Sequence, residues 1–112
     1  MPRYLISFAA HAMDHIPAED MPAVSDASHA VVREAMDAGV WVFGGGILDE
    51  KAQIVAGDGA VTDGPYPEAI SGMSIVDVPS REEAVEWAAK IAIACRCAQE
   101  VREFMPDPAV GN

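Results

Sequence analysis

The order of helical and strand-like segments constrains the fold of this chain more than any other feature. One helix is expected between an N-cap at Asp20 and a C-terminal stop at Gly39, and a second helix is expected to begin at Ser80. A strand-like segment lies before and after each helix, and a hairpin pattern lies between the two middle strands. This order predicts an α+β fold, a ferredoxin-like βαββαβ sandwich with an extra β-hairpin, in a single domain over residues 1–112.

The two helices are predicted from apolar spacing and from capping. The first carries one stripe of apolar and small residues at steps of three and four, with a single step at its end: Met21, Val24, Ser28, Val31, Ala35 and Met36. In the second, Ser80 and Glu83 form a capping box. Its apolar side holds Ala84, Trp87, Ala88, Ile91 and Ala92. Both helices are therefore expected to cover the same face of one sheet.

The strands are predicted from alternation and from short apolar runs. Expected strands span residues 3–9, 40–43, 73–78 and 98–105, and an expected hairpin joins 53–56 to 60–62. The second strand is interrupted by three glycines at 44–46 before Ile47 and Leu48 resume it. Glycines within a strand pattern indicate a bulge or a close approach of two backbones.

The sheet face away from the helices is expected to be half polar and half apolar. Its polar positions would be Ser7, Ser74 or Asp77, and Arg102 or Glu103. A face of this composition is usually covered by other protein. A second copy of the chain is the simplest cover, with two sheets meeting face to face, so we expect a homodimer.

Charge and hydropathy exclude two classes of partner. Lys and Arg number 7 against 18 Asp and Glu, which gives a formal net charge of -11. Such an acidic surface repels phosphate backbones and anionic lipid, so nucleic acid is not expected as a partner. No apolar run approaches the roughly 20 residues that cross a bilayer, and no membrane association is expected.

The two cysteines predict a reducing compartment. Cys95 and Cys97 stand one residue apart, and a disulfide between them would close a small, strained ring. Reduced thiols in a cytoplasmic protein are the expected state. No thiol motif surrounds them, so plain buried thiols are favoured over a redox pair or a soft-metal site.

The stretch VTDGPYPEAISG, at positions 61–72, has two interpretations. In the first it is a turn, because Pro65 fixes φ, Gly64 permits positive φ and Asp63 can accept bonds from nearby backbone N–H groups. In the second the turn also holds a site, with Asp63 and Glu68 as carboxylates at a pocket mouth and Tyr66 as an aromatic wall or phenolic donor. If the two carboxylates lay together and partly buried, their repulsion would make one of them a proton carrier near neutral pH.

The histidines and one arginine complete the set of candidate residues. His11 and His15 flank Asp14, a spacing that could bind zinc on a helix, but the segment favours a solvated loop and no metal is expected. His29 lies beside the apolar stripe of the first helix, either as a hydrogen-bonded helix residue or as a general base facing a cavity. Arg102 is a candidate clamp for a carboxylate.

Several segments together resemble the YCII-related family, in its DGPF-domain branch, which is named for an Asp-Gly-Pro-Phe motif. Here the motif reads Asp63-Gly64-Pro65-Tyr66, with Glu68 following. Similar segments are Glu19-Asp20-Met21, Ala38-Gly39-Val40, Ile75-Val76-Asp77-Val78, Glu86-Trp87-Ala88 and Glu100-Val101-Arg102. The chain departs from the family after the motif, where Ala69-Ile70-Ser71-Gly72-Met73 lacks the usual Lys-Glu pair and phenylalanine.

The resemblance implies a dimeric α+β barrel in which the sheets of two subunits enclose a cavity. Family members are mostly uncharacterised, and similar barrels include muconolactone isomerases. The wider family carries a histidine–aspartate pair, and His29 lies near the position of that histidine.

These features support three alternative functions. The first is a cofactor-free isomerase- or lyase-like enzyme acting in a dimer-interface cavity, with Asp63 and His29 as catalytic residues and Tyr66, Glu68 and Arg102 as substrate-binding residues. The second is a ligand-binding module without catalysis. The third is a dimer that serves protein interaction alone.

Overall fold

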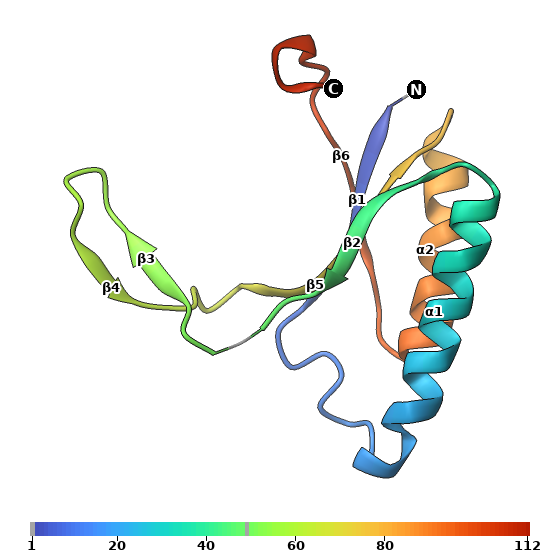
Figure 1. Cartoon of the computed structure of the whole chain (residues 1–112), viewed down its shortest axis with the longest axis horizontal. Helices are drawn as coiled ribbons and strands as arrows, with labels where there is room; N and C mark the ends of the chain where they lie inside the picture. The colour runs from blue at the N-terminus through green and yellow to red at the C-terminus, as the bar shows by residue number, and fades with distance from the viewer. Residues whose placement is uncertain (1, 49) are drawn as a thin grey trace.

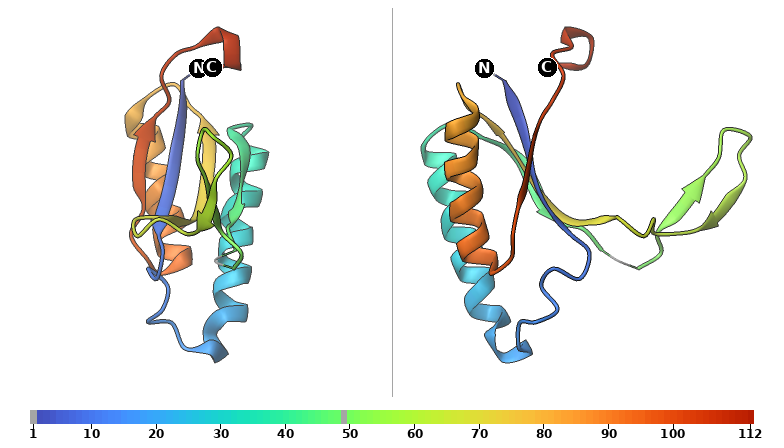
Figure 2. Two further views of the ribbon diagram at one scale, coloured as in Figure 1. Left: turned by 90° about the vertical axis from the view of Figure 1, so that its left-hand side faces the viewer. Right: turned by 180° about the vertical axis from the view of Figure 1, so that it is seen from behind.

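A four-stranded antiparallel sheet forms the centre of the computed structural model, which describes residues 2–48 and 50–112 (Figure 1). Its strands are β1 (Arg3–Ala9), β2 (Trp41–Gly46), β5 (Ile70–Asp77) and β6 (Glu100–Glu103), in the spatial order β2-β5-β1-β6. Helices α1 (Met21–Asp37) and α2 (Arg81–Cys95) lie side by side on one face of this sheet (Figure 2). The expected α+β class and the common face for both helices are confirmed.

The remaining elements lie outside this two-layer body. Strands β3 (Gln53–Val55) and β4 (Val61–Asp63) pair only with each other in a separate two-stranded sheet. We call residues 50–69, which contain this hairpin, the arm. Two short 3-10 helices, η1 (Ala18–Asp20) and η2 (Pro108–Val110), precede α1 and follow β6. Among the described residues, no helix is both long enough and apolar enough to cross a lipid bilayer.

The core lies between the sheet and α2. Tyr4 and Ile6 of β1 point toward the helices and are only 3% and 0% exposed, as the alternation of the strand predicts. They pack with Val76, Val78, Ala84, Ala88, Ile91 and Cys95. The alanines of α2 let the helix backbone approach the sheet closely, so the core is filled mainly by side chains of the strands.

The glycine run of β2 meets one of the two alternatives expected for it, the close approach of two backbones. The strand continues through Gly46 and is not interrupted, and the register shift in its pairing with β5 lies between Trp41 and Phe43, before the glycines. A Cβ at Gly44 would lie 2.5 Å from Met73 O and 2.9 Å from Ser74 Cα. Because real Cβ atoms do not approach backbone this closely, only glycine fits at this position.

The helix boundaries confirm one cap and correct another. Ser80 Oγ accepts a bond of 3.2 Å from the Glu83 N–H, as the capping box predicts. Gly39 has a φ of +75° after α1, which confirms the C-terminal stop. Asp20 precedes α1, but its side chain caps no helical N–H. Its Oδ2 instead accepts a bond of 2.9 Å from Arg96 Nη1, at the far end of α2.

Two strand boundaries and the open sheet face also differ from expectation. β5 begins at Ile70, before the expected start at 73, and β6 ends at Glu103, inside the expected span of 98–105. Of the expected polar positions, Ser7, Asp77 and Arg102 lie on the face away from the helices, which we call the open face. Ser74 and Glu103 pair with the helix-facing Ile6 and Tyr4 and therefore lie on the helix side.

Candidate functional site

A hollow in the described part of the chain lies under α1, between that helix and the edge strand β2. Its volume is about 460 Å³. The apolar stripe predicted for α1 faces it, because every residue of that stripe except Ala35 lines its wall. The opposite wall includes Phe8, Trp41 and Gly44 from the sheet. The volume falls within the range of small-molecule sites.

The residue sizes on the two walls explain why this space stays open. On β2 the positions from Gly44 to Gly46 carry no side chain, and on α1 the facing side chain in mid-helix is the small Ser28. The ring of Trp41 lies directly over Gly44, where an added Cβ would be 2.7 Å from its Cη2 atom. The glycines therefore set the depth of the cavity, and Trp41 forms part of its floor.

The polar groups of the cavity are few. Ser25, Ser28 and His29 line it from α1, Ser74 from β5, and Gln99 from the segment before β6. His29 is also exposed to solvent, which puts its imidazole at the mouth, and Ser28 Oγ donates to the Ser25 carbonyl at 2.9 Å. An apolar hollow with several polar groups can hold an apolar molecule and orient a polar substituent of it.

Cys95 is part of the inner wall of the cavity, and its thiol is held neutral. Burial raises the pKa of Cys95, and the nearby thiol of Cys97 raises it further. Burial also raises the pKa of Cys97, against a smaller lowering by its bond to Gln99. Both cysteines are free, as expected. Because the thiolate is the nucleophile and the metal ligand, a neutral Cys95 acts here as a small apolar wall residue.

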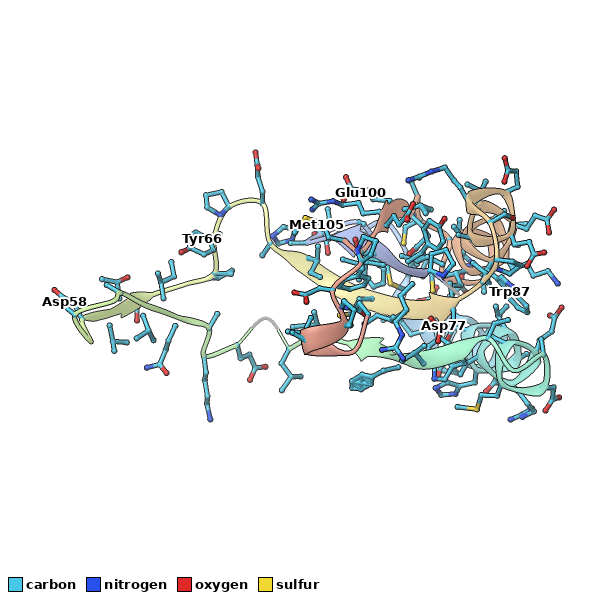
Figure 3. All side chains as sticks on the ribbon, turned by 90° about the horizontal axis from the view of Figure 1, so that it is seen from above. Asp58, Tyr66, Asp77, Trp87, Glu100 and Met105 are labelled. Atoms are coloured by element: carbon cyan, nitrogen blue, oxygen red, sulfur yellow. The ribbon has the colours of Figure 1, made fainter. Side chains whose placement is uncertain are left out.

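The structure brings only one of the five expected site residues to this cavity. His29 lines it, whereas Asp63, Tyr66 and Glu68 are exposed on the arm. Figure 3 shows Tyr66 on the arm, away from the body. Arg102 is exposed on the open face, across the sheet from the helices. Within a single chain these residues therefore form no common site. The partial burial on which the proton-carrier hypothesis for Asp63 and Glu68 depends is not found in the single chain.

The stretch after β4 contains a turn, but it lies at Pro67 and Glu68 and not at the Gly64–Pro65 step on which the turn interpretation rests, and Gly64 does not use a positive φ. Asp63 ends β4, the Gly64–Pro65 peptide is cis, and the Gly64 N–H donates to the Ala52 carbonyl at 2.9 Å. The Ala69 N–H then donates to the Tyr66 carbonyl at 3.1 Å, which closes the bend. The turn thus fixes the root of the arm where the chain enters β5.

The histidine pair before α1 lies in a loop. His11 Nδ1 lies 2.8 Å from Asp14 Oδ2, and both side chains are exposed. His15 is exposed as well. Within residues 2–48 and 50–112, no group of three His, Cys, Asp or Glu side chains is placed to hold a metal ion.

Sequence reasoning missed the cavity itself and most of its wall. Trp41, Gly44 and Met13 line it, although none of them was a candidate site residue. A usable signal was present, because the stripe of α1 contains two methionines and a serine, which fill space less completely than branched residues. Beside the glycine run, that composition indicates loose packing between α1 and β2.

Comparison with known families gives one match. The model of the YCII-related domain family matches residues 8–106, a span that includes the whole cavity wall, the arm and most of the sheet. No curated protein matches the chain. The chain belongs to the YCII-related domain family.

Proposed function

We propose that this member of the YCII-related domain family is a small-molecule-binding protein whose ligand occupies the cavity under α1. The observation that carries this proposal is the hollow of about 460 Å³, lined by apolar side chains with a few polar groups. Functional pockets have this size and composition, whereas packed interiors leave few voids larger than a water molecule. The family match names no ligand or reaction, so the site itself has to indicate the ligand class.

The wall of the cavity favours an aromatic or flexible apolar ligand. Three methionine side chains line it: Met13, Met21 and Met36. Thioether side chains adapt to ligands of different shape and make favourable contacts with aromatic rings, and Phe8 and Trp41 add aromatic surface. The net charge of -11 disfavours polyanions. We therefore propose a neutral or singly charged ligand with one polar group directed toward Ser28 and His29.

A thermal-shift experiment tests the cavity with small probes. Phenol, indole, benzoate and cyclohexanol are added at 10 mM to the wild type and to Ser28→Phe, whose ring fills the hollow. A probe that binds with a Kd of about 1 mM stabilises the folded state by ~1.4 kcal/mol. At this chain length, that corresponds to a rise in Tm of about 5 °C. We expect this rise in the wild type and its loss in Ser28→Phe.

The matched control is Ala30→Phe, which adds the same ring at an exposed position of α1 that faces the groove toward α2 and not the cavity. This variant should respond to the probes as the wild type does. If no probe stabilises the wild type more than Ser28→Phe, the cavity is not a binding site.

A catalytic role is the second candidate, and the position of His29 at the cavity mouth favours it. An imidazole there could remove a proton from a bound carbon acid, as a cofactor-free isomerase or lyase requires. For a cavity-binding ketone such as cyclohexenone, we expect exchange of its α-hydrogens in D₂O to be about 100-fold faster with the wild type than with His29→Gln. NMR measures the exchange. Equal rates at equal binding would leave a binding protein without catalysis.

The expected assembly remains part of this proposal. The spatial order β2-β5-β1-β6 with two helices on one face supports the ferredoxin-like interpretation. The uncovered open face supports a homodimer in which two sheets meet as a dimeric α+β barrel. The segment from Asp63 to Tyr66 supports the DGPF branch, and two free cysteines support a cytoplasmic location.

A further inference from the structure

The arm extends away from the body on the side of the sheet opposite the helices (Figures 1 and 2). Its strands bond to each other, and its base joins the sheet through backbone bonds such as Ala10 N–H to Ala69 O at 2.9 Å. The radius of gyration is 15.5 Å. A compact domain of this length would have about 13 Å. The arm is therefore not folded back onto its own chain.

The arm exposes more apolar surface than is expected for a hairpin that stays in contact with solvent. Val55 and Val61 pair across the two strands and are 66% and 53% exposed. Asp63 lies two residues beyond Val61 and so shares its face. A two-stranded hairpin is marginally stable in water unless it packs on other protein. The exposed valine pair therefore indicates a surface that another element covers.

The open face offers a surface of matching pattern. One row of cross-strand partners runs across all four strands of the sheet: Phe43, Ile75, Leu5 and Arg102. The first three are apolar, and Phe43 is 58% exposed. The row therefore presents apolar side chains along most of its length and one cation at its β6 end.

The charged residues on the open face and on the arm indicate which segment can bind to this row. Arg102 is exposed, and no carboxylate of the described residues pairs with it. On the arm, Asp63 and Glu68 are exposed and likewise pair with no described cation. The arm thus combines an apolar pair with carboxylates, and the open face combines an apolar row with a cation. The arm and the open face lie on the same side of the molecule, so a copy seated on that face would lie beside the arm.

We propose that the arm of each chain docks on the open face of a second copy, where Asp63 and Glu68 meet Arg102 of that copy. This inference rests on the homodimer proposed above and adds what each copy contributes to the other. The contact brings four of the expected site residues together, because Asp63, Tyr66 and Glu68 all lie on the arm that meets Arg102 of the other copy. Two-fold symmetry repeats the contact, so the dimer has two such composite sites, each incomplete in a single chain.

Charge reversal with rescue tests the contact. Analytical ultracentrifugation measures the dimer Kd of the wild type, of Arg102→Glu, of Asp63→Arg and of the double variant. Each single variant places like charges together and should weaken the dimer about ten-fold or more. The double variant exchanges the charges and should recover most of that loss. Arg33→Glu, an exposed reversal on α1, is the matched control and should leave the Kd unchanged.

A zero-length crosslink identifies the partner atoms directly. In an Arg102→Lys variant mixed from ¹⁵N-labelled and unlabelled chains, a carbodiimide should join the new amine to Asp63 or Glu68 of the other isotope. Mass spectrometry of the peptides reads this out. Crosslinks within one chain only would overturn the proposal.

The outcomes separate this inference from the proposals it rests on. A wild type that stays monomeric overturns both the homodimer and the docked arm, while probe binding under α1 is measured independently. A dimer that Arg102→Glu weakens no more than Arg33→Glu keeps the homodimer and overturns the docked arm. Weakening without rescue in the double variant also overturns the pairing of Asp63 with Arg102.

Discussion

Replacing Gly44 with alanine is expected to lower the free energy of unfolding by about 3 kcal/mol, because the new methyl group would press β2 away from β5. The added Cβ would lie 2.5 Å from Met73 O and 2.9 Å from Ser74 Cα, and both of these atoms belong to the backbone. A side chain can rotate out of the way, but a paired strand can yield only by breaking its register. Urea denaturation monitored by circular dichroism measures the change.

The adjacent glycine provides the control. A Cβ at Gly45 would have no atom within 4 Å, so Gly45→Ala should change stability by less than about 0.5 kcal/mol. Equal effects of the two alanines would show that β2 tolerates a methyl group at either place. The assigned close approach of β2 to β5 would then be wrong.

Truncating Ile6 to alanine is expected to remove about 2–5 kcal/mol of stability. The side chain is 0% exposed at the centre of the core, between Tyr4 on its own strand and the alanine face of α2. Domains of this size have total stabilities of about 5–15 kcal/mol, so the loss is a large share of the whole. Thermal unfolding should therefore show a Tm lower by 10 °C or more, on the order of the known size scaling.

A surface isoleucine distinguishes burial from residue type. Ile93 of α2 is 80% exposed, and Ile93→Ala should shift stability by no more than about 0.5 kcal/mol. If both truncations cost the same, the core is not where the structure puts it.

The sequence was sufficient for the features that local chemistry controls. The capping box at Ser80 depends on residues three apart, and the stop at Gly39 depends on one residue's freedom at positive φ. The stripe of α1 and the alternation of β1 likewise follow from spacing alone. These signals give the class of fold and the face that each helix buries.

Features that depend on distant partners could not be predicted from local patterns. Asp20 resembles an N-cap, but its carboxylate accepts a hydrogen bond from Arg96 at the end of α2. β5 begins early because Ile70 pairs with Ala9 of β1. The strand pattern of residues 98–105 is longer than β6 because β6 pairs with β1 only from Tyr4 to Ser7.

In the candidate site too, locally determined features could be predicted and features that depend on tertiary structure could not. A turn in the stretch after β4 was readable from its residues, although it lies at Pro67 and Glu68, and nothing in the sequence says that the arm points away from the body. The cavity under α1 depends on how far a helix stands from a glycine-rich strand, which is a tertiary distance. His29 could be placed on the right element by its spacing, whereas Trp41 gave no signal of lining a hollow.

Helix α1, which covers the cavity, is held only weakly against the rest of the chain. Only Val24 and Ala35 of α1 are buried, and two ion pairs, Arg96 with Asp20 and Lys90 with Glu34, join its ends to the neighbouring helix at exposed positions. Exposed ion pairs contribute about 0–1 kcal/mol each and weaken as salt rises. A ligand is therefore expected to enter the cavity past α1 more easily at high salt concentration than at low salt concentration.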